Sequence, residues 1–372
     1  MRFWSVAPLA AAALATVGAS GGPAFAEQGV RITGPHVHEN LAVYFVHGVG
    51  AGGPVPLTLQ EALAKGQVQV VETGRDNELQ VENSGGEPVF IQAGDIVKGG
   101  KQDRVLTVSL LLPPKSGRVP IASFCVEQGR WTARGKEDQA KFSSSAEAMP
   151  SARALLSMAA PPQPSQPQAG YTTAGGPAEP AQRAAREREQ RVARERDEVA
   201  EKQRQVWDQV ANTQRKLSSG LGAAVASPQS ASSLQLSLEN EKLKAARGAY
   251  VKALQPSGEK EGDVIGYVVA INGRISAANV YPSNALFRKM WGKQLAAVVT
   301  EAIGEKTASA PAAAPPAPKA ATEFLAAAEK GKSYERALAA GMRQEVRDAD
   351  KALLNEARGA DGKWIHRSYL AK

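Results

Sequence analysis

The chain has 372 residues, 43% of them hydrophobic and only 5% aromatic, and a formal net charge of +8. Its single cysteine excludes an internal disulfide, so a fold of this length must be stabilised by a buried core. Past the N-terminal region, no stretch approaches about 18 uninterrupted apolar residues, which argues against a transmembrane span. The 35 glycines and 23 prolines favour one folded core flanked by linkers.

The N-terminus has the pattern of a secretory signal peptide. Arg2 precedes an apolar, Ala-rich run at 6–17, and Ala24-Phe25-Ala26 matches a small-x-small cleavage site. We therefore predict a signal peptide at 1–26 and a mature protein that starts at Glu27, in the periplasm or outside the cell.

Residues 27–149 are predicted to form the β-rich half of the main domain, as antiparallel strands. Runs of β-branched or alternating residues, such as 41–46 and 79–81, are separated by Gly, Asn and Asp turn signals. A short helix interrupts them, because Thr58 and Glu61 have the spacing of a capping box.

A Pro-, Gln- and Ala-rich stretch at 150–182 cannot bury a core and is predicted to be a flexible, disordered linker. A long helix is predicted to follow at 181–216. Three valines recur every seven residues along it: Val192, Val199 and Val206. Because three valines make a thin seam, a solvated helical arm is favoured over a coiled coil that binds a protein partner. Trp207 and Val210 widen the apolar stripe, which predicts that the end of the helix docks on the core.

The segment 183–303 is predicted to complete the main domain. It begins with the helical arm, and a second helix is expected at 237–254. Strands at 264–271 and 274–280 follow, joined by Asn272-Gly273, a dipeptide that suits the two positive φ angles of a type I′ turn.

The last predicted elements are a helix, a linker and a tail. Ser283 can cap a helix that continues to Ile303. Beyond it we predict an Ala/Pro linker at 304–322 and a helical C-terminal tail at 323–372. The predicted fold class is α+β: an antiparallel β-rich N-terminal half, helices and a β-hairpin that complete one main domain, linkers and the helical tail.

Glycine, charge and the only cysteine concentrate in two segments, 94–104 and 124–131. Between residues 95 and 136, eight Lys and Arg face three Asp and Glu, a balance of +5. This excess predicts an anionic partner, either a small molecule or an anionic envelope surface. Aromatic residues do not interleave with the basic ones, which disfavours nucleic acid.

The first segment has some features of a phosphate-binding P-loop but lacks its pattern. An extra Gly100 precedes Lys101, and Gln102 replaces the hydroxyl that binds magnesium. A nucleoside triphosphatase is therefore disfavoured. Two interpretations stay open: an anion site formed by backbone amides with Lys101 and Arg104, or a tight turn with solvated basic residues.

The second segment contains candidate catalytic residues. A strand at 122–128 would point Phe124 and Val126 toward the core. Cys125 and Glu127 would then share the opposite face. A thiolate near Lys or Arg is a competent nucleophile, whereas a lone cysteine is commonly a small buried residue, and both interpretations stay open. Glu127 is the candidate acid/base group.

The histidines make a weak case for a metal. His36, His38 and Glu39 are close in sequence and His47 follows, but the fourth histidine is distant, at 366. Since metal sites need three or four converging ligands, we expect surface histidines here and no metal site.

Five segments carry a resemblance to a known family: 78–83, 94–104, 125–131, 206–207 and 266–291. In them the chain resembles a family of prokaryotic proteins named for association with ADP-ribosylglycohydrolase (ARG) and rhodanese-phosphatase proteins. The resemblance is expected to cover 29–135 and 200–303. It implies enzymatic work linked to NAD or ADP-ribose chemistry and specifies no cofactor. It also implies a site among these polar residues: Glu78, Asn83, Asp95, Lys101, Gln102, Arg104, Cys125, Glu127 and Arg130.

Two functions stay open, and with them the question of whether the protein is an enzyme. In the first, an extracytoplasmic protein binds an anionic small molecule through Arg104 and Arg130, with Glu127 as acid/base if the protein is a hydrolase. In the second, a non-enzymatic envelope scaffold uses the same residues to pin buried turns. An open pocket shared by these side chains would favour the first function, and closed, buried ion pairs the second.

Overall fold

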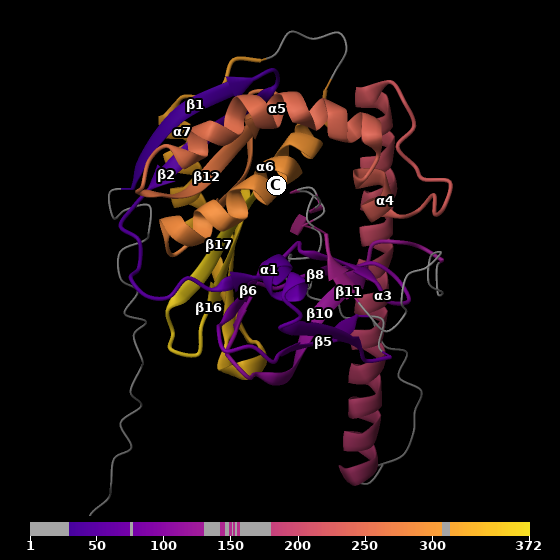
Figure 1. The fold of residues 1–372 in the computed structure, drawn as a ribbon. Coiled ribbons are helices and arrows are strands. Elements are labelled where there is room, and N and C mark those ends of the chain that lie inside the picture. The colour runs from indigo at the N-terminus through magenta and orange to yellow at the C-terminus, as the bar shows by residue number, and fades with distance from the viewer. Residues whose placement is uncertain are drawn as a thin grey trace, which may run out of the picture.

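The computed structural model describes residues 30–74, 77–129, 142–145, 149–150, 152, 155–156, 180–306 and 313–372. The chain forms three β-sheets with helices packed around them, which confirms the predicted α+β class with a β-rich N-terminal half (Figure 1). The predicted signal peptide at 1–26 and most of the linker at 150–182 lie outside the described residues. Within the described part of the chain, no helix combines the length and apolarity needed to cross a membrane.

The largest sheet has eight antiparallel strands drawn from the start, the middle and the end of the chain. Its strand order is β1-β2-β12-β13-β17-β16-β15-β14. The strands are β1 (Arg31–His38), β2 (Leu41–His47), β12 (Val264–Ile271), β13 (Arg274–Val280), β17 (Trp364–Ala371), β16 (Ala352–Arg358), β15 (Arg343–Asp348) and β14 (Lys332–Ala337).

Helices cover both faces of this sheet (Figure 1). They are α5 (Glu241–Glu259), α6 (Asn284–Gly304) and α7 (Pro318–Glu329). On the face covered by α5 and α6, the rings of Phe45 and Tyr267 pack against Trp291. On the opposite face, Leu325 of α7 joins Tyr44 in a separate cluster. Tyr44 and Phe45 are neighbours on β2, and strand alternation sends them to opposite faces.

The predicted hairpin and the helix after it match the structure. β12 and β13 are joined by Asn272 and Gly273, whose φ angles are 50° and 74°, as a type I′ turn requires. Ser283 caps α6, since its side chain accepts a hydrogen bond from the Leu286 amide. The residues of the turn therefore determine the β12–β13 hairpin, and the Ser283 cap determines where α6 begins.

The single helix predicted at 237–254 is two helices in the structure. A short helix, α4 (Leu234–Leu238), comes first, and α5 follows it. The side chain of Asn240 accepts hydrogen bonds from the amides of the next turn, so a new helix begins there.

The C-terminal tail is mostly β-structure, so the predicted helical tail at 323–372 is wrong beyond α7. Residues 332–371 form β14 to β17, with a 3-10 turn, η2 (Ala339–Gly341), between β14 and β15. Ala, Leu, Glu and Arg favour helix locally, but strand pairing overrides that preference in β16 and β17. Because β17 lies between β13 and β16, the tail is part of the main domain. The linker predicted at 304–322 is also shorter, since α7 begins at Pro318.

Two smaller sheets form the rest of the β-rich half, in the orders β11-β7-β8-β10-β5-β4 and β3-β6-β9. The first contains β4 (Val68–Glu72), β5 (Glu78–Asn83), β7 (Ile96–Gly99), β8 (Arg104–Leu106), β10 (Gly117–Cys125) and β11 (Phe142–Ser144). The second contains β3 (Leu57–Thr58), β6 (Val89–Ile91) and β9 (Leu110–Leu112). β3 and β6 are parallel, an exception to the predicted antiparallel arrangement. α1 (Leu59–Ala64) begins with the predicted capping box of Thr58 and Glu61.

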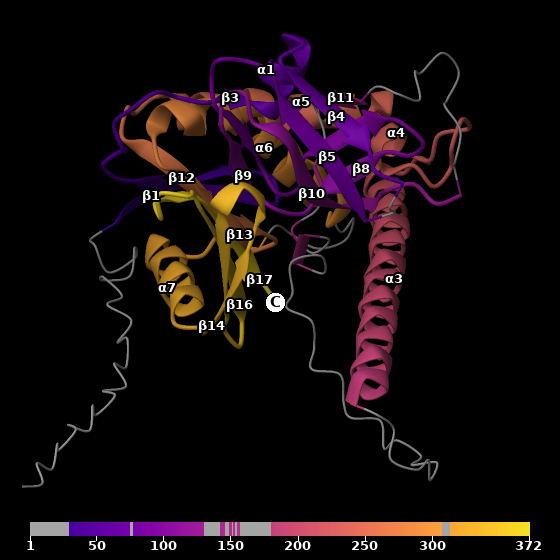
Figure 2. The same ribbon diagram turned by 90° about the horizontal axis from the view of Figure 1, so that it is seen from below.

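The predicted long helix is α3 (Pro180–Leu221), which stands beside the body of the protein and extends past it (Figure 2). Its second half docks on the core as predicted, with Val206, Val210 and Leu217 buried. In its first half, the described side chains from Arg186 to Glu198 are exposed. That exposure fits a solvated arm, and a protein partner for the arm stays a prediction.

Candidate functional site

The two predicted site segments meet where β8 pairs with β10. Arg104 and Cys125 lie opposite each other on these strands, and Arg104 Nη1 is 2.7 Å from Cys125 Sγ. Arg104 Nη2 is 3.4 Å from a carboxylate oxygen of Glu72. Arg104 and Cys125 are each 2% exposed, and Glu127 is 0% exposed. The structure therefore brings the predicted cation and thiol together, but in the interior rather than at the surface.

Helices α3 and α4 close over this cluster. The side-chain amide of Gln203, on α3, accepts a hydrogen bond from the Cys125 amide and donates one to the Cys125 carbonyl, both at 2.9 Å. At α4, the Leu234 amide donates to the Val126 carbonyl at 3.1 Å. The strand predicted at 122–128 ends at Cys125, and the residues on both of its faces are buried there. Strand alternation therefore does not separate a core side from an accessible side.

Asp103 fixes the glycine turn that precedes β8. Asp103 accepts hydrogen bonds from the Gly99 amide at 3.0 Å and from the Ser233 hydroxyl at 3.4 Å. Gly99 and Gly100 have φ angles of 120° and 56°, and a side chain on Gly100 would collide with the Phe142 ring. Both glycines are therefore explained by a tight turn under an aromatic ring.

Two other predicted residues lie in separate structural contacts. Asp95 forms an ion pair with Lys293 of α6 at 2.5 Å, and the two side chains are 3% and 8% exposed. Asn83 holds a turn together by donating to the Glu87 and Pro113 carbonyls and accepting from the Gly85 amide. These contacts fix loops to the core.

Three more predicted residues have different surroundings. Lys101 is exposed, whereas the Gln102 side chain is fully buried, with no hydrogen-bond partner in the described part of the chain. Arg130 lies outside the described residues. Since Arg104, Cys125 and Glu127 are also buried, the described members of the predicted set do not line an open pocket together.

One predicted residue, Glu78, lines a cleft instead. The cleft has a volume of about 340 Å³ and lies between strands β5 and β10 on one side and β14 with η2 on the other. Leu110, Ile121 and Leu338 contribute apolar lining, and Arg336 contributes a guanidinium. Small-molecule sites commonly enclose about 300–1,000 Å³, so the cleft has the size of a ligand pocket.

Arg336 is the candidate residue that the sequence analysis missed, because its segment was predicted to be a helical tail. It is an exposed residue of the edge strand β14, and desolvation by the neighbouring protein lowers its pKa. The Arg336 Nε donates to the Gln344 side chain at 2.6 Å. Among the described residues, no carboxylate lies within ion-pair distance of it.

A second cation approaches Arg336 from α3. The pKa of Lys202 is lowered first by burial and then by the positive charge of Arg336, while Glu198 opposes the shift. Two cations from different elements therefore raise the positive potential at this end of the molecule. An anion that binds beside Arg336 gains from both.

Two smaller cavities have volumes of about 30 and 20 Å³, which is room for one or two water molecules. The first contains Glu301, whose pKa is raised by burial and which accepts hydrogen bonds from the Ala152 amide and the Ser276 hydroxyl. The second contains His366, whose burial lowers its pKa to about 3 and whose Nδ1 lies 2.9 Å from the Ser109 hydroxyl. Both cavities are too small for a substrate.

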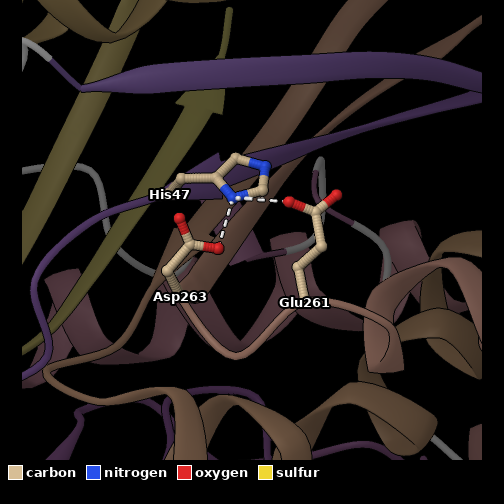
Figure 3. A group of neighbouring side chains, drawn as sticks. All are labelled: His47, Glu261 and Asp263. Carbon is tan, nitrogen blue, oxygen red and sulfur yellow. Dashed lines mark hydrogen bonds and ion pairs between the residues drawn. The ribbon is translucent and has the colours of Figure 1, made fainter.

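A cluster with the chemistry of a metal site lies at one end of the large sheet. His47, at the end of β2, faces Glu261 and Asp263, which precede β12 (Figure 3). His47 is 3% exposed, so the expectation of a surface histidine is wrong for it, while His36 and His38 are half-buried on β1. The two carboxylates come from a distant part of the chain, so sequence spacing could not place them beside His47.

Comparison with known proteins agrees with the resemblance carried by the sequence. The ARG and Rhodanese-Phosphatase-superfamily-associated Protein domain matches residues 29–370. The match includes the helical arm and the C-terminal strands, so the expected coverage of 29–135 and 200–303 was too narrow. No curated protein and no solved structure matches the chain. The chain belongs to the family of ARG and rhodanese-phosphatase-superfamily-associated proteins.

Proposed function

We propose that this protein binds an anionic small molecule, outside the cytoplasm, in the cleft between β5, β10 and β14. The observation that carries the proposal is Arg336, whose guanidinium lines a cleft of about 340 Å³ and has no described carboxylate as its partner. A guanidinium without a carboxylate partner can form charge-assisted hydrogen bonds with a bound anion. The extracytoplasmic location rests on the signal-like sequence at 1–26.

The other groups in the cleft favour a ligand that has apolar and hydroxylated parts as well as charge. Leu110, Ile121 and Leu338 offer an apolar surface for a ring. Glu78 offers carboxylate oxygens that accept hydrogen bonds from hydroxyl groups. ADP-ribose combines these features, and the family name points to ADP-ribosylglycohydrolase association, so ADP-ribose is the first ligand to test.

The proposal extends to catalysis if the protein hydrolyses the ligand that it binds in the cleft. Glu78 is a carboxyl group in the cleft with which a ligand or a water molecule can exchange a proton. On this interpretation the buried cluster of Arg104, Cys125 and Glu127 supports the wall of the cleft and does not touch the ligand. The variant Glu78→Gln should then keep ADP-ribose binding and lose turnover, which chromatography of the products measures.

Calorimetric titration of the chain with ADP-ribose tests the binding site. We expect Arg336→Gln to weaken binding roughly tenfold or more, which corresponds to about 1.4 kcal/mol. The matched control is Arg274→Gln, since Arg274 is exposed at the start of β13 and does not line the cleft. Equal binding by wild type and Arg336→Gln would contradict the proposal. An equal loss in both variants would indicate a general effect of net charge and would also contradict it.

The second candidate function is a non-enzymatic envelope scaffold. It is favoured by the closed burial of Arg104, Cys125 and Glu127, which is typical of structural contacts. The exposed half of α3 would then contact the partner. Deleting residues 157–196 removes that half and leaves the docked half in place. The scaffold interpretation expects the deletion to abolish co-purification of an envelope protein, while the ligand-site interpretation expects unchanged binding of ADP-ribose.

A further inference from the structure

Three side chains from two segments of the chain converge at the end of the large sheet (Figure 3). His47 is the last residue of β2, and Glu261 and Asp263 lie in the turn between α5 and β12. One ligand atom from each residue lies within 4.8 Å of the others. His47 Nδ1 is 2.9 Å from an oxygen of Asp263 and 3.6 Å from an oxygen of Glu261. In a tetrahedral zinc shell, neighbouring ligand atoms are roughly 3.3 Å apart, a value that these two distances bracket.

Thr33 holds the ring of His47 in place. Its hydroxyl oxygen lies 2.8 Å from His47 Nε2, and only 2% of the His47 side chain is exposed. Histidines that bind metals commonly use the second ring nitrogen in this way, because the outer hydrogen bond fixes both the tautomer and the ring orientation. With Nε2–H donating to Thr33, the lone pair of Nδ1 lies on the side of the carboxylates.

The contacts of His47 Nδ1 conflict with each other. A donor, Arg31 Nη2, lies 2.8 Å from it, and an acceptor, Asp263 Oδ1, lies 2.9 Å from it. Without a proton, Nδ1 accepts from Arg31 but meets the carboxylate lone pair to lone pair. With a proton, Nδ1 donates to Asp263 but meets the N–H groups of Arg31. No protonation state of the ring satisfies both neighbours, whereas a cation held by the nitrogen and the carboxylate satisfies both ligands.

We propose that His47, Glu261 and Asp263 bind a divalent transition-metal cation, with Zn²⁺ as the test ion, and that binding displaces the guanidinium of Arg31. A neutral imidazole and two carboxylates balance the charge of such an ion. The imidazole ligand disfavours Ca²⁺ and Mg²⁺, which prefer oxygen. Three protein ligands leave the fourth position of a tetrahedral zinc to water or to another bound group.

The exposure of the cluster allows the exchange of cations. The side chains of Glu261, Asp263 and Arg31 are 52%, 51% and 53% exposed, so an ion reaches the carboxylates from solvent. Arg31 forms an ion pair with Asp263 at 2.8 Å, so this ligand is held as a carboxylate. Arg31 has room to turn outward, and exposed ion pairs such as its contacts here contribute little to stability.

Titration of the full chain with Zn²⁺, in competition with a chelating indicator, tests the site. We expect one Zn²⁺ per chain in the wild type. Arg31→Gln should bind it roughly tenfold more tightly or better, because a competing positive charge a few ångströms away is removed. The double variant Glu261→Gln/Asp263→Asn should bind it roughly a hundredfold more weakly or worse, because two charged ligands are lost.

The matched control is Glu323→Gln/Asp361→Asn. It removes two carboxylates of similar exposure, 65% and 58%, elsewhere on the surface, and should bind Zn²⁺ as the wild type does. The visible absorption of tetrahedral Co²⁺ gives a second readout, present in the wild type and absent in Glu261→Gln/Asp263→Asn. Thermal unfolding without metal confirms that each variant is folded.

Two results would overturn the proposal. If Arg31→Gln binds Zn²⁺ no more tightly than the wild type, Arg31 does not compete for the site and the cluster is an ion-pair network. If Glu261→Gln/Asp263→Asn keeps its Zn²⁺, the ion binds elsewhere. Neither outcome depends on ADP-ribose, so the test is independent of the proposed anion site.

Discussion

Gln203 on α3 forms two hydrogen bonds with the backbone of Cys125, so a helix side chain takes the place of a neighbouring strand. β10 ends at this point, and the Gln203 side chain makes the hydrogen bonds with the Cys125 amide and carbonyl that a further strand would make. The pair therefore attaches α3 to the sheet beside the buried Arg104.

Replacing Gln203 with Ala should lower the free energy of unfolding by roughly 2–4 kcal/mol, because two buried backbone groups lose their partners. Gln205→Ala is the matched control, since Gln205 is exposed on the same helix, and its effect should stay below about 0.5 kcal/mol. Urea denaturation measures both variants. A similar effect for the two substitutions would show that the Gln203 contact is not what attaches the helix.

The thiol of Cys125 should be unreactive in the folded protein. With 2% exposure, it should react with an aromatic disulfide reagent only as fast as the protein opens, and rapidly in urea. Absorbance of the released thiolate follows the reaction. Fast labelling of a chain that keeps its far-UV circular dichroism would restore Cys125 as a candidate nucleophile.

His366 should make the protein sensitive to acid. Burial lowers its pKa from 6.5 to about 3, so the unfolded chain binds the proton first as the pH falls. The stability that the neutral ring contributes is fully present above pH 6.5 and is lost as the pH falls toward about 3. Between these values the wild type should lose about 1.4 kcal/mol per pH unit more than His366→Gln. Urea denaturation of both proteins at a series of pH values measures the difference, and parallel pH profiles would contradict it.

Glu301 should act in the opposite direction. Its pKa is raised from 4.5 by burial, so its contribution to stability is fully present below pH 4.5 and is lost as the pH rises through the folded-state pKa. Glu301→Gln keeps an acceptor for the Ala152 amide without the charge. Above pH 4.5, the stability of wild type relative to Glu301→Gln should therefore decrease as the pH rises. A constant difference across this range would argue against a buried, titrating carboxyl.

Ending the chain at Gly331 should abolish folding rather than remove an accessory tail. The truncation deletes β14 to β17 and leaves β13 paired on one side only, with β12, which exposes apolar surface on the remaining half-sheet. Soluble yield and circular dichroism measure the outcome. A chain that lacks only Lys372 should fold normally, since Lys372 lies beyond the last strand. A soluble, folded product that ends at Gly331 would mean that the strands before it form a domain alone.

Local chemistry explains which elements could be predicted from the sequence. Asn272-Gly273 determines the turn between β12 and β13, and Ser283 determines the start of α6. Each signal acts within a few residues, so both elements can be predicted from the sequence. The strands after residue 331 depend on pairing with β13, more than fifty residues earlier. Their amino-acid composition favours helix, so the sequence alone does not predict them as strands. The predicted site could also be inferred only where neighbouring segments determine it. The pairing of Arg104 with Cys125 follows from two adjacent strands, but its burial depends on α3 and α4, and Arg336 reaches the cleft only through the C-terminal strands.

The position of β17 has a consequence for the order in which the chain acquires its structure. β17 follows all the other strands of the eight-stranded sheet in sequence, yet it lies in the middle of that sheet, between β13 and β16. The two parts of the large sheet, β1-β2-β12-β13 and β16-β15-β14, therefore cannot be joined until β17 has been made. Sheets that depend on such distant pairings form slowly, which leaves the newly made chain unfolded for longer.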